Sequence, residues 1–400
     1  MASLFYAWEF GANFGHIGAF LPLGRALRDE GHEVHWVVTQ TGPAARLLAK
    51  EGFTWLQAPL PQEQPQKTPP LTYADILLRF GYADPDDLSG LVVAWRELFL
   101  LGKAQLVLAD HAPTAVLAAR TLGIPVMLFS NGFTVPPRIR PMPNMRPWQN
   151  FPEAQLLALE DRALVSINQV LHDFGKPAIN ALHQLFEVEE EALITYPELD
   201  HYENRGPARY WGSMPNAAIG IPPPWPPMEG KRIFAYLRAE TPHAEAALNV
   251  LRQLGRPTVV YLPGVSPAQL EKWQCAHIVF ADAAVDIERA TREADVAVTY
   301  SSLATTTAFL MAGKPLLLLP THLEQFLLAR RIVEMGAGIV QSSEQPANDM
   351  ASHVITLLDN PAYTNNARAF SAKYASFDQS SVVANLVRRV DELCSGVDIK

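Results

Sequence analysis

The segment from residue 296 to residue 312 has the composition of an anion-binding turn. A buried, strand-like run, Val296 to Thr299, leads through a hydroxyl-rich turn into a helix-like run, Leu303 to Ala312. The first N–H groups of a helix lack intrahelical partners and lie at the positive end of its dipole, so they can hold a pyrophosphate. The residue types alone leave a second interpretation open, in which the hydroxyls cap and pack the helix. The side chains that can add hydrogen-bond donors here are Tyr300, Ser301, Ser302, Thr305 and Thr306.

A second candidate is His16, which lies in a glycine-rich loop, Glu9 to Gly18, after the strand-like run Leu4 to Trp8. Ligands of doubly wound sheets bind at the carboxyl ends of the strands, where this loop begins. An imidazole titrates near neutral pH and is therefore an efficient general base. A histidine in a loop can equally be a capping or packing residue, and the residues alone leave that role open.

Asp110 ends another strand-like run, Leu106 to Ala109, and is expected at the same edge of the sheet as His16. A carboxylate in that place can orient a basic histidine, as in catalytic triads. The alternative is that Asp110 caps the helix that follows. Four polar residues of neighbouring loops are further candidates for the acceptor side of a site: Glu9, Asn13, Ser130 and Asn131.

Residues 295–338 resemble the donor-binding signature of the UDP-glycosyltransferase superfamily. In that family a His-x-Gly-x-Gly-Thr turn precedes a helix, and Gly-x-Pro and Pro-x-x-x-Asp/Glu-Gln follow. The matching residues here are Thr305, Gly313-Lys314-Pro315, Pro320 and Glu324-Gln325. The resemblance implies that Glu324 and Gln325 bind the hydroxyl groups of the donor sugar.

This signature differs from the family pattern at several positions. The histidine of the family falls on Tyr300, its glycines fall on Ser302 and Ala304, and a glutamate of the plant members falls on Ala308. Tyr300 can donate a hydrogen bond to a phosphate but cannot be a cation. We therefore expect the leaving diphosphate to be stabilised by the helix start rather than by a positive side chain.

The N-terminal segment Phe14-Gly15-His16-Ile17-Gly18 resembles the Gly-His loop of the same superfamily, and Gly31-His32-Glu33-Val34 resembles its later Gly-His-x-Val. In the family the histidine of the first loop is the catalytic base, and Asp110 resembles its partner aspartate. The resemblance therefore implies an inverting transfer with His16 as base. We assign His32 a structural role.

Short apolar strands alternate with helix-like runs in both halves of the chain, which indicates an α/β fold. With the resemblance, this predicts the GT-B architecture: two Rossmann-like doubly wound domains that face a cleft, and a C-terminal helix that crosses back to the first domain. A proline-rich run separates the halves and reads as a stiff linker. The predicted divisions are an acceptor-binding domain at 1–214, the linker at 215–230, a nucleotide-sugar-binding domain at 231–378 and the returning helix at 379–400.

Position in this fold adds two groups to the donor side. Tyr236 and Arg238 end the first predicted strand of the second domain, Arg232 to Leu237. The loop Phe280 to Asp286 precedes the signature and is expected to border the nucleotide base. The stretch 134–190, proline-rich and then amphipathic, is expected to shape the acceptor site.

Composition narrows the classes of function. The 400 residues carry a formal net charge of −9, which argues against a general nucleic-acid binder. Arg138, Arg140 and Arg146 form one basic stretch, which we interpret as a solvated loop. The two cysteines, Cys275 and Cys394, cannot form a disulfide framework or a cysteine-based metal site. The first residues lack the pattern of a signal peptide, and no apolar run is long enough for a membrane helix, so the expected compartment is the cytoplasm.

These observations predict a metal-independent glycosyltransferase that needs no cofactor and uses a nucleotide-diphosphate sugar, such as a UDP-sugar, as substrate. Its expected partners are a small-molecule donor and acceptor, without nucleic acid or integral membrane contact, and the sequence leaves a homodimer open. One alternative is a non-catalytic nucleotide-sugar-binding protein. Another is a non-hydrolysing nucleotide-sugar epimerase, which would need a carboxylate cluster around the sugar that the sequence does not show.

Overall fold

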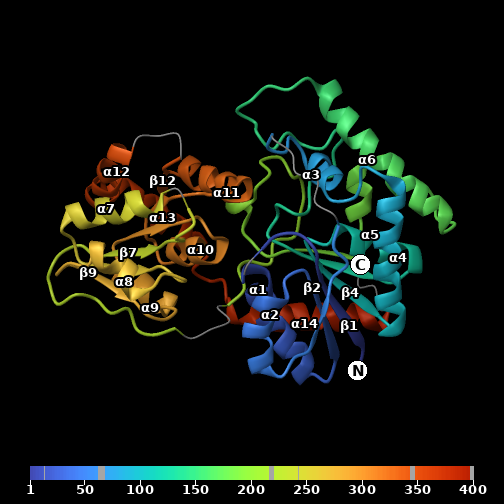
Figure 1. The fold of residues 1–400 in the computed structure, drawn as a ribbon, viewed down its shortest axis with the longest axis horizontal. Coiled ribbons are helices and arrows are strands. Elements are labelled where there is room, and N and C mark those ends of the chain that lie inside the picture. The colour runs from blue at the N-terminus through green and yellow to red at the C-terminus, as the bar shows by residue number, and fades with distance from the viewer. Residues whose placement is uncertain (13, 62–67, 216–219, 242, 343–346, 397–400) are drawn as a thin grey trace. The chain divides into compact units, whose positions relative to one another are not determined.

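The computed structural model describes residues 1–12, 14–61, 68–215, 220–241, 243–342 and 347–396. The chain forms two compact units. The first comprises Met1–Ala217 and Gln379–Lys400, and the second comprises Ala218–Asp378. Each unit is a parallel sheet covered by helices, so the prediction of two doubly wound α/β domains is confirmed (Figure 1).

The first unit is built on six parallel strands in the order β3-β2-β1-β4-β5-β6. Its central strands are apolar along nearly their whole length, because a parallel sheet with helices on both faces offers no wet side. The strands are β1 (Ser3–Trp8), β2 (Glu33–Val38), β3 (Trp55–Gln57), β4 (Leu106–Asp110), β5 (Val126–Ser130) and β6 (Glu190–Leu193).

The helices of the first unit form two groups. Helix α1 packs on α2 and on the last helix of the chain, α14, whereas α4 packs on α5 and α6. These helices are α1 (Gly15–Asp29), α2 (Thr41–Leu47), α3 (Tyr73–Arg79), α4 (Pro85–Leu101), α5 (Pro113–Leu122), α6 (Glu153–Asp173) and α14 (Ser380–Ser395), with short 3-10 turns η1 (Ala49–Glu51), η2 (Leu182–Phe186) and η3 (Pro197–Leu199).

The second unit repeats this plan with six parallel strands in the order β12-β11-β10-β7-β8-β9. The strands are β7 (Ile233–Tyr236), β8 (Thr258–Tyr261), β9 (Ile278–Ala281), β10 (Val296–Thr299), β11 (Leu316–Leu318) and β12 (Gly338–Val340). The helices are α7 (Ala244–Leu254), α8 (Pro267–Leu270), η4 (Glu271–Trp273), α9 (Ile287–Glu293), α10 (Leu303–Met311), α11 (Leu323–Glu334), α12 (Ala347–Asp359) and α13 (Pro361–Lys373).

Both sheets have the same topology, 3-2-1-4-5-6 when each unit's strands are numbered along the chain. Ligands of such sheets bind outside the carboxyl ends of the two central strands, where the strand order reverses. In the first unit these ends are Trp8 and Asp110, which are register partners. In the second unit they are Tyr236 and Thr299, also register partners. The topology therefore brings the residues singled out in each half to the ligand-binding edge of their own sheet.

The start of α1 differs from the prediction. The sequence places His16 in a loop that runs to Gly18, but α1 begins at Gly15, so His16 lies in its first helical turn. Glycines 15 and 18 suggested a loop, yet the helix tolerates them because its apolar side, with Phe20 buried, packs into the core. The first turn carries no side-chain cap.

The described part of the predicted linker is packed against the second unit. Ile221 forms a bridge with Val285, and Trp225 Nε1 donates to Glu293 at 2.7 Å. The returning helix α14 buries Leu386 and Val390 within the first unit.

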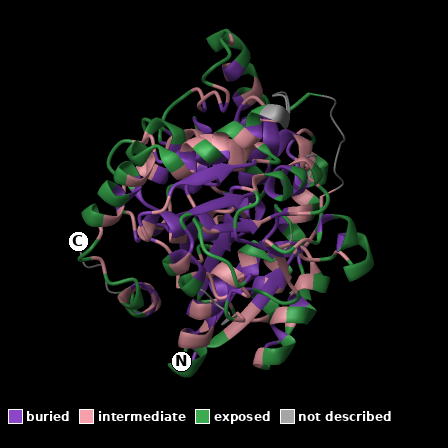
Figure 2. Cartoon of the chain, turned by 90° about the vertical axis from the view of Figure 1, so that its left-hand side faces the viewer, coloured by how far each residue is buried: buried purple, intermediate pink, exposed green. Residues whose placement is uncertain are grey.

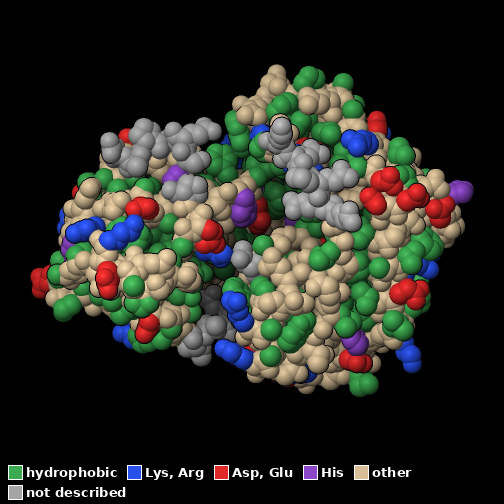
Figure 3. Space-filling model, in the orientation of Figure 1, with side chains coloured by type: hydrophobic (Ala, Val, Ile, Leu, Met, Phe, Trp, Pro, Cys, Tyr) green, Lys and Arg blue, Asp and Glu red, His purple; other side chains and the backbone are tan. Residues whose placement is uncertain are grey.

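Figure 2 shows the strands as the buried centre of the fold and the exposed residues on outer helical faces and loops. Acidic and basic side chains are interspersed on the face drawn in Figure 3.

Candidate functional site

The edge of the first sheet holds a histidine–carboxylate pair. His16 Nδ1 lies 3.0 Å from each carboxylate oxygen of Asp110, which ends β4. The two side chains are 20% and 8% exposed. Because Asp110 faces Nδ1, it favours the tautomer that carries the proton there, and Nε2 is the basic nitrogen. Asp110 therefore orients the imidazole of His16.

The last residue of β1 and one residue of the β1–α1 loop fix the His16 ring from other directions. The indole of Trp8 stacks on it, with ring centroids 5.0 Å apart and 23° between the planes. Gly11 has φ +100°, and a Cβ at this position would lie 2.4 Å from His16 Nε2. A side chain at position 11 would therefore occupy the space beside the basic nitrogen, so both the backbone conformation and the histidine require glycine here.

Asp110 has a second partner that sequence reasoning missed. The hydroxyl of Tyr6, in the middle of β1, donates to Asp110 Oδ2 at 2.8 Å. Tyr6 is fully buried and stacks on Phe20, and burial raises the pKa of its hydroxyl, with the Asp110 carboxylate adding to the effect. Tyr6 is therefore a permanent donor to Asp110. The apolar strand pattern around it made it look like an ordinary core residue.

Glu9 has a different place from the one predicted. Its carboxyl group is buried and accepts hydrogen bonds from the backbone N–H groups of Thr114 and Ala115, at 2.9 and 3.1 Å. These N–H groups belong to the first turn of α5, so Glu9 caps that helix from another loop. Burial raises the pKa of Glu9 to about 8, against the opposing effect of those N–H donors. This contact makes Glu9 part of the scaffold rather than of an acceptor surface.

The other acceptor-side candidates lie in or near the β5 loop, except Asn13, which lies outside the described residues. Ser130 is buried; its Oγ pairs with Thr134 Oγ1 at 2.7 Å and accepts from the N–H of Gly132. Asn131 Oδ1 accepts from the N–H of Phe133 at 3.1 Å. Both side chains thus shape the turn after β5, at the same edge as His16.

His111 is a further residue at this edge that the sequence analysis did not single out. It follows Asp110 with φ +47°, a conformation that non-glycine residues seldom adopt. Its carbonyl accepts from the N–H of Phe10 at 3.1 Å, which ties the β4 and β1 loops together. Its ring centroid lies 6.4 Å from that of His16. Burial, and secondarily the charge of His16, lower the pKa of His111 to about 3, so it stays neutral beside the candidate base.

The edge of the second sheet carries the hydroxyl-rich turn. Ser301 has φ +64°, and Ser302 is the N-cap residue of α10, but its side chain makes no capping hydrogen bond. The first turn of α10 also contains no acidic residue. Four buried hydroxyl oxygens of this region have no hydrogen-bond partner among the described residues, those of Ser301, Ser302, Thr306 and Thr307. Thr305 is buried beside them. These hydroxyl groups therefore do not cap α10.

Tyrosines line the same edge. Tyr236 ends β7 and Tyr300 follows β10; their ring centroids are 5.0 Å apart with an interplanar angle of 88°. Tyr261, at the end of β8, lies 5.0 Å from Tyr236 on its other side. The guanidinium carbon of Arg238 lies 5.7 Å from the centroid of Tyr300. The structure therefore brings together the candidates Tyr236, Tyr300 and Arg238, and adds Tyr261.

Glu324 and Gln325 lie in the first turn of α11, directly after the neighbouring strand β11, and are partly exposed. Gln325 Oε1 accepts from both the N–H and the hydroxyl of Thr321, each at 2.9 Å. This local contact fixes the turn that presents both side chains at the carboxyl edge of the second sheet.

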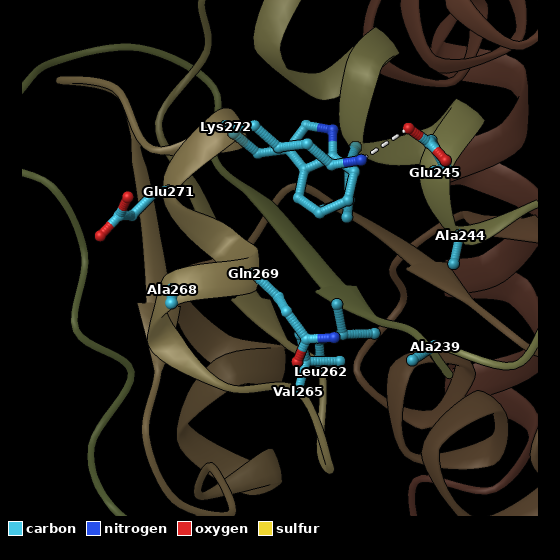
Figure 4. A pocket seen from close by; sticks show the side chains of 11 residues that line it. Ala239, Ala244, Glu245, Leu262, Val265, Ala268, Gln269, Glu271 and Lys272 are labelled. Atoms are coloured by element: carbon cyan, nitrogen blue, oxygen red, sulfur yellow. Dashed lines mark hydrogen bonds and ion pairs between the residues drawn. The ribbon is translucent and has the colours of Figure 1, made fainter.

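The second unit also has a pocket that no residue of the 300–306 turn lines. It lies between α7 and the α8–η4 segment (Figure 4). Two of its polar side chains have partners: Lys272 Nζ is 2.8 Å from Glu245 Oε1, and Trp273 Nε1 donates to Asn249. The residues that line it include no histidine–carboxylate pair like that of His16 and Asp110.

Two features that would indicate other classes of site are absent from the described residues. No group of three or more His, Cys, Asp or Glu side chains is placed to hold a metal ion in that part of the chain. In the same residues no helix combines the length and the apolar character needed to cross a membrane. The basic stretch in the β5–α6 connection is paired with acidic residues: Arg138 binds Glu191, and Arg140 binds Asp161.

Comparison with known proteins identifies the fold. Residues 285–390, from the loop before α9 into α14, match the family profile of the C-terminal domain of erythromycin biosynthesis protein CIII-like proteins. No curated protein sequence matches the chain.

Solved structures resemble nearly the whole chain. The spinosyn rhamnosyltransferase SpnG is 18% identical with a TM-score of 0.69, covering 96% of this chain and 100% of its own. The glycosyltransferase of kitacinnamycin is 16% identical with a TM-score of 0.70 and 98% coverage of both chains. VinC, in complex with dTDP, is 18% identical with a TM-score of 0.66, covering 99% of this chain and 100% of its own. The chain therefore has the GT-B fold of these glycosyltransferases, and its residues 285–390 carry the EryCIII-like C-terminal domain signature.

Proposed function

We propose that this protein is an inverting, metal-independent glycosyltransferase that moves a sugar from a nucleotide-diphosphate donor to an acceptor hydroxyl or amine. The observation that carries the proposal is the His16–Asp110 pair, with Nδ1 3.0 Å from both carboxylate oxygens at the ligand-binding edge of a GT-B fold. The same arrangement of base and orienting carboxylate activates weak nucleophiles in other enzymes.

The proposed reaction needs one base and one leaving group. His16 Nε2 removes the proton of the acceptor hydroxyl while its oxygen attacks the anomeric carbon of the donor sugar. The bond from that carbon to the diphosphate oxygen breaks, the configuration inverts, and the nucleoside diphosphate leaves with the electron pair. Asp110 stabilises the imidazolium that forms at His16.

The proposed donor site is the start of α10. Its N–H groups have no side-chain cap, and the surrounding hydroxyls have no partner among the described residues, so a diphosphate there would satisfy several polar groups at once. Glu324 and Gln325 are assigned to the hydroxyls of the donor sugar. VinC and SpnG were solved with thymidine diphosphate. We therefore propose a dTDP-sugar, in addition to a UDP-sugar, as the donor.

A panel of nucleotides tests the donor site. The full chain is heated with UDP, dTDP, GDP and ADP, and then with the corresponding sugars. A ligand that binds only the folded protein stabilises it by about 2.7 kcal/mol at 100 times its Kd, which raises the melting temperature measurably. We expect a rise with UDP or dTDP; no rise with any nucleotide would contradict the proposal.

The departure at Tyr300 favours one other candidate, a nucleotide-sugar-binding protein without transfer activity. The two functions differ in donor turnover. An enzyme releases free nucleoside diphosphate from its nucleotide sugar in the presence of acceptor, whereas a binding protein returns the donor unchanged.

The two cysteines, Cys275 and Cys394, form no disulfide, and we propose the reducing cytoplasm as the compartment.

A further inference from the structure

The carboxyl ends of three adjacent strands in the second unit carry an aromatic and cationic cluster. Tyr261, Tyr236 and Tyr300 follow or end β8, β7 and β10, and the N–H of Tyr300 donates to the carbonyl of Tyr236 at 3.3 Å. Arg238 lies two residues beyond the end of β7, with its guanidinium over the Tyr300 ring. Tyr300 in turn is separated from the N-cap residue of α10 only by Ser301. The cluster is therefore adjacent to the uncapped helix start.

The sequence signature does not show which group opposes the negative charge of the leaving diphosphate. A nucleoside diphosphate leaves with several negative charges, and enzymes usually oppose them with a cation or a metal as well as with N–H groups. Tyr300 occupies the position at which the family signature has an imidazole, and a phenol carries no positive charge at any pH. Burial, and then the neighbouring Tyr300, raise the pKa of Tyr236, so its hydroxyl is also neutral.

We propose that Arg238 supplies the positive charge that faces the leaving diphosphate, with the ring of Tyr300 as the platform that positions its guanidinium. This inference rests on the proposed function and adds to it the source of the charge. It means that the cation has moved from the β10–α10 turn to the end of the neighbouring strand β7. The two positions meet at one edge because β7 and β10 are paired in register.

The chemistry of Arg238 suits this role. A guanidinium is always charged, stacks on aromatic rings and binds phosphate oxygens through two parallel N–H groups. One of its partners is Glu240, 2.6 Å away, whose side chain is 62% exposed. An exposed ion pair is worth little in water, so a diphosphate can displace the Glu240 carboxylate from Arg238 without a large loss.

The test separates the phosphates from the nucleoside. Calorimetric titration of the full chain with dTDP or UDP is compared with titration of the corresponding nucleoside. We expect Arg238→Ala to weaken diphosphate binding by about 10- to 100-fold, the range for loss of a charged hydrogen-bonding group. Binding of thymidine or uridine should be unchanged, because the nucleoside carries no phosphate.

Two further variants show whether charge is what matters. In the Arg238→Ala background, Tyr300→His should recover much of the diphosphate affinity at pH 6 and less at pH 8, since an imidazole is charged only at the lower pH. Glu240→Gln should tighten diphosphate binding a few-fold by removing the competing carboxylate. Arg292→Ala removes an equally charged arginine that lies in the last turn of α9 and pairs with Glu288; it is the matched control and should bind like the wild type.

The outcomes are distinguishable. If Arg238→Ala binds the diphosphate as tightly as the wild type, or loses nucleoside and diphosphate equally, the role of Arg238 is refuted and the proposed function stands. If the wild type binds no nucleoside diphosphate, the proposed function fails and this inference fails with it. Melting curves of each unliganded variant establish that a loss of binding is not a loss of fold.

Discussion

At the scale of single residues, the candidate base is held by contacts that converge from several parts of the first unit. Asp110 faces Nδ1 of His16, Trp8 covers its ring, and Gly11 leaves room beside Nε2. Tyr6 donates a hydrogen bond to Oδ2 of Asp110. A base whose position is fixed in advance loses little entropy when the acceptor arrives, which is how such shells contribute to rate.

Tyr6→Phe tests this arrangement without changing the stacked ring. Removal of the hydroxyl leaves the Asp110 carboxylate less satisfied, so it should favour the imidazolium form of His16 more strongly. We expect kcat to fall by about 10- to 100-fold, the effect of one hydrogen bond to a charged group, with the KM for the donor unchanged. The acid limb of the pH–rate profile should move to higher pH.

Tyr82→Phe is the matched control, because Tyr82 is another buried tyrosine of the same unit, and its hydroxyl pairs with Thr114 instead. It should leave the pH profile in place. Identical profiles for wild type and Tyr6→Phe would show that Tyr6 has no role in positioning Asp110.

At the scale of elements, the helix starts are the parts of the site that the sequence described least well. The loop after β1 supplies the cap of α5 through Glu9, a contact between residues more than a hundred positions apart. Such a contact has no local signal, and the position of Glu9 in the loop after the first strand made it an acceptor-side candidate instead. By contrast α10, for which the sequence left a side-chain cap open as one of two interpretations, has none.

Glu9→Gln tests the buried cap through its pH dependence. The pKa of Glu9 is about 8 in the folded chain against an ordinary value of 4.5. A carboxyl group whose pKa is raised on folding stabilises the folded state fully below its unfolded value, and this contribution is lost as the pH rises through the folded value. Between pH 5 and 8 the wild type should therefore lose on the order of a few kcal/mol that Glu9→Gln does not lose.

The measurement is urea denaturation of both proteins at several pH values. The difference in unfolding free energy between Glu9→Gln and wild type should shift in favour of the variant as the pH rises. A difference that stays constant from pH 5 to 8 would mean that Glu9 is ionised in the folded protein throughout.

At the scale of the whole molecule, the chain repeats one topology and then returns to its first unit. Helix α14 packs on α1, and His32 links the two ends of this unit: its Nδ1 accepts from the N–H of Ala2, and its Nε2 lies 2.9 Å from Asp391. Arg389 of α14 also binds Glu190 of β6 at 2.7 Å. The first unit therefore depends on the last helix of the chain for part of its core.

Leu386→Ala tests that dependence. Leu386 is fully buried, so its truncation should lower the free energy of unfolding by about 2 to 5 kcal/mol. Binding of a nucleoside diphosphate, which the proposal assigns to the second unit, should retain its wild-type Kd at a temperature where the variant is folded. The exposed Arg388 on the same helix gives the control variant, Arg388→Ala, with little expected change. An unchanged denaturation midpoint for Leu386→Ala would contradict the packing described.

The sequence predicted the features that depend on local patterns and missed those that depend on contacts between residues far apart in the chain. The alternation of apolar strands and helices is a local pattern, and it predicted both doubly wound domains. His16, Asp110 and the turn at 300–306 were singled out because strand ends mark the ligand edge of such sheets and because both segments resemble a known family, and as site residues they stay predictions. Tyr6, His111 and Tyr261 were missed, because each looks like a core or loop residue until the register of neighbouring strands places it beside the site.

The most direct measurement of the central claim separates transfer from donor binding in one variant, His16→Gln. The full chain is incubated with UDP- and dTDP-sugars and a panel of phenolic and aliphatic alcohols, and glycosylated products are quantified by mass spectrometry. The account predicts that His16→Gln lowers the transfer rate by about 10²- to 10⁴-fold, the range for loss of a general base, and leaves the Kd for the nucleoside diphosphate unchanged. Transfer at the wild-type rate by His16→Gln would contradict it.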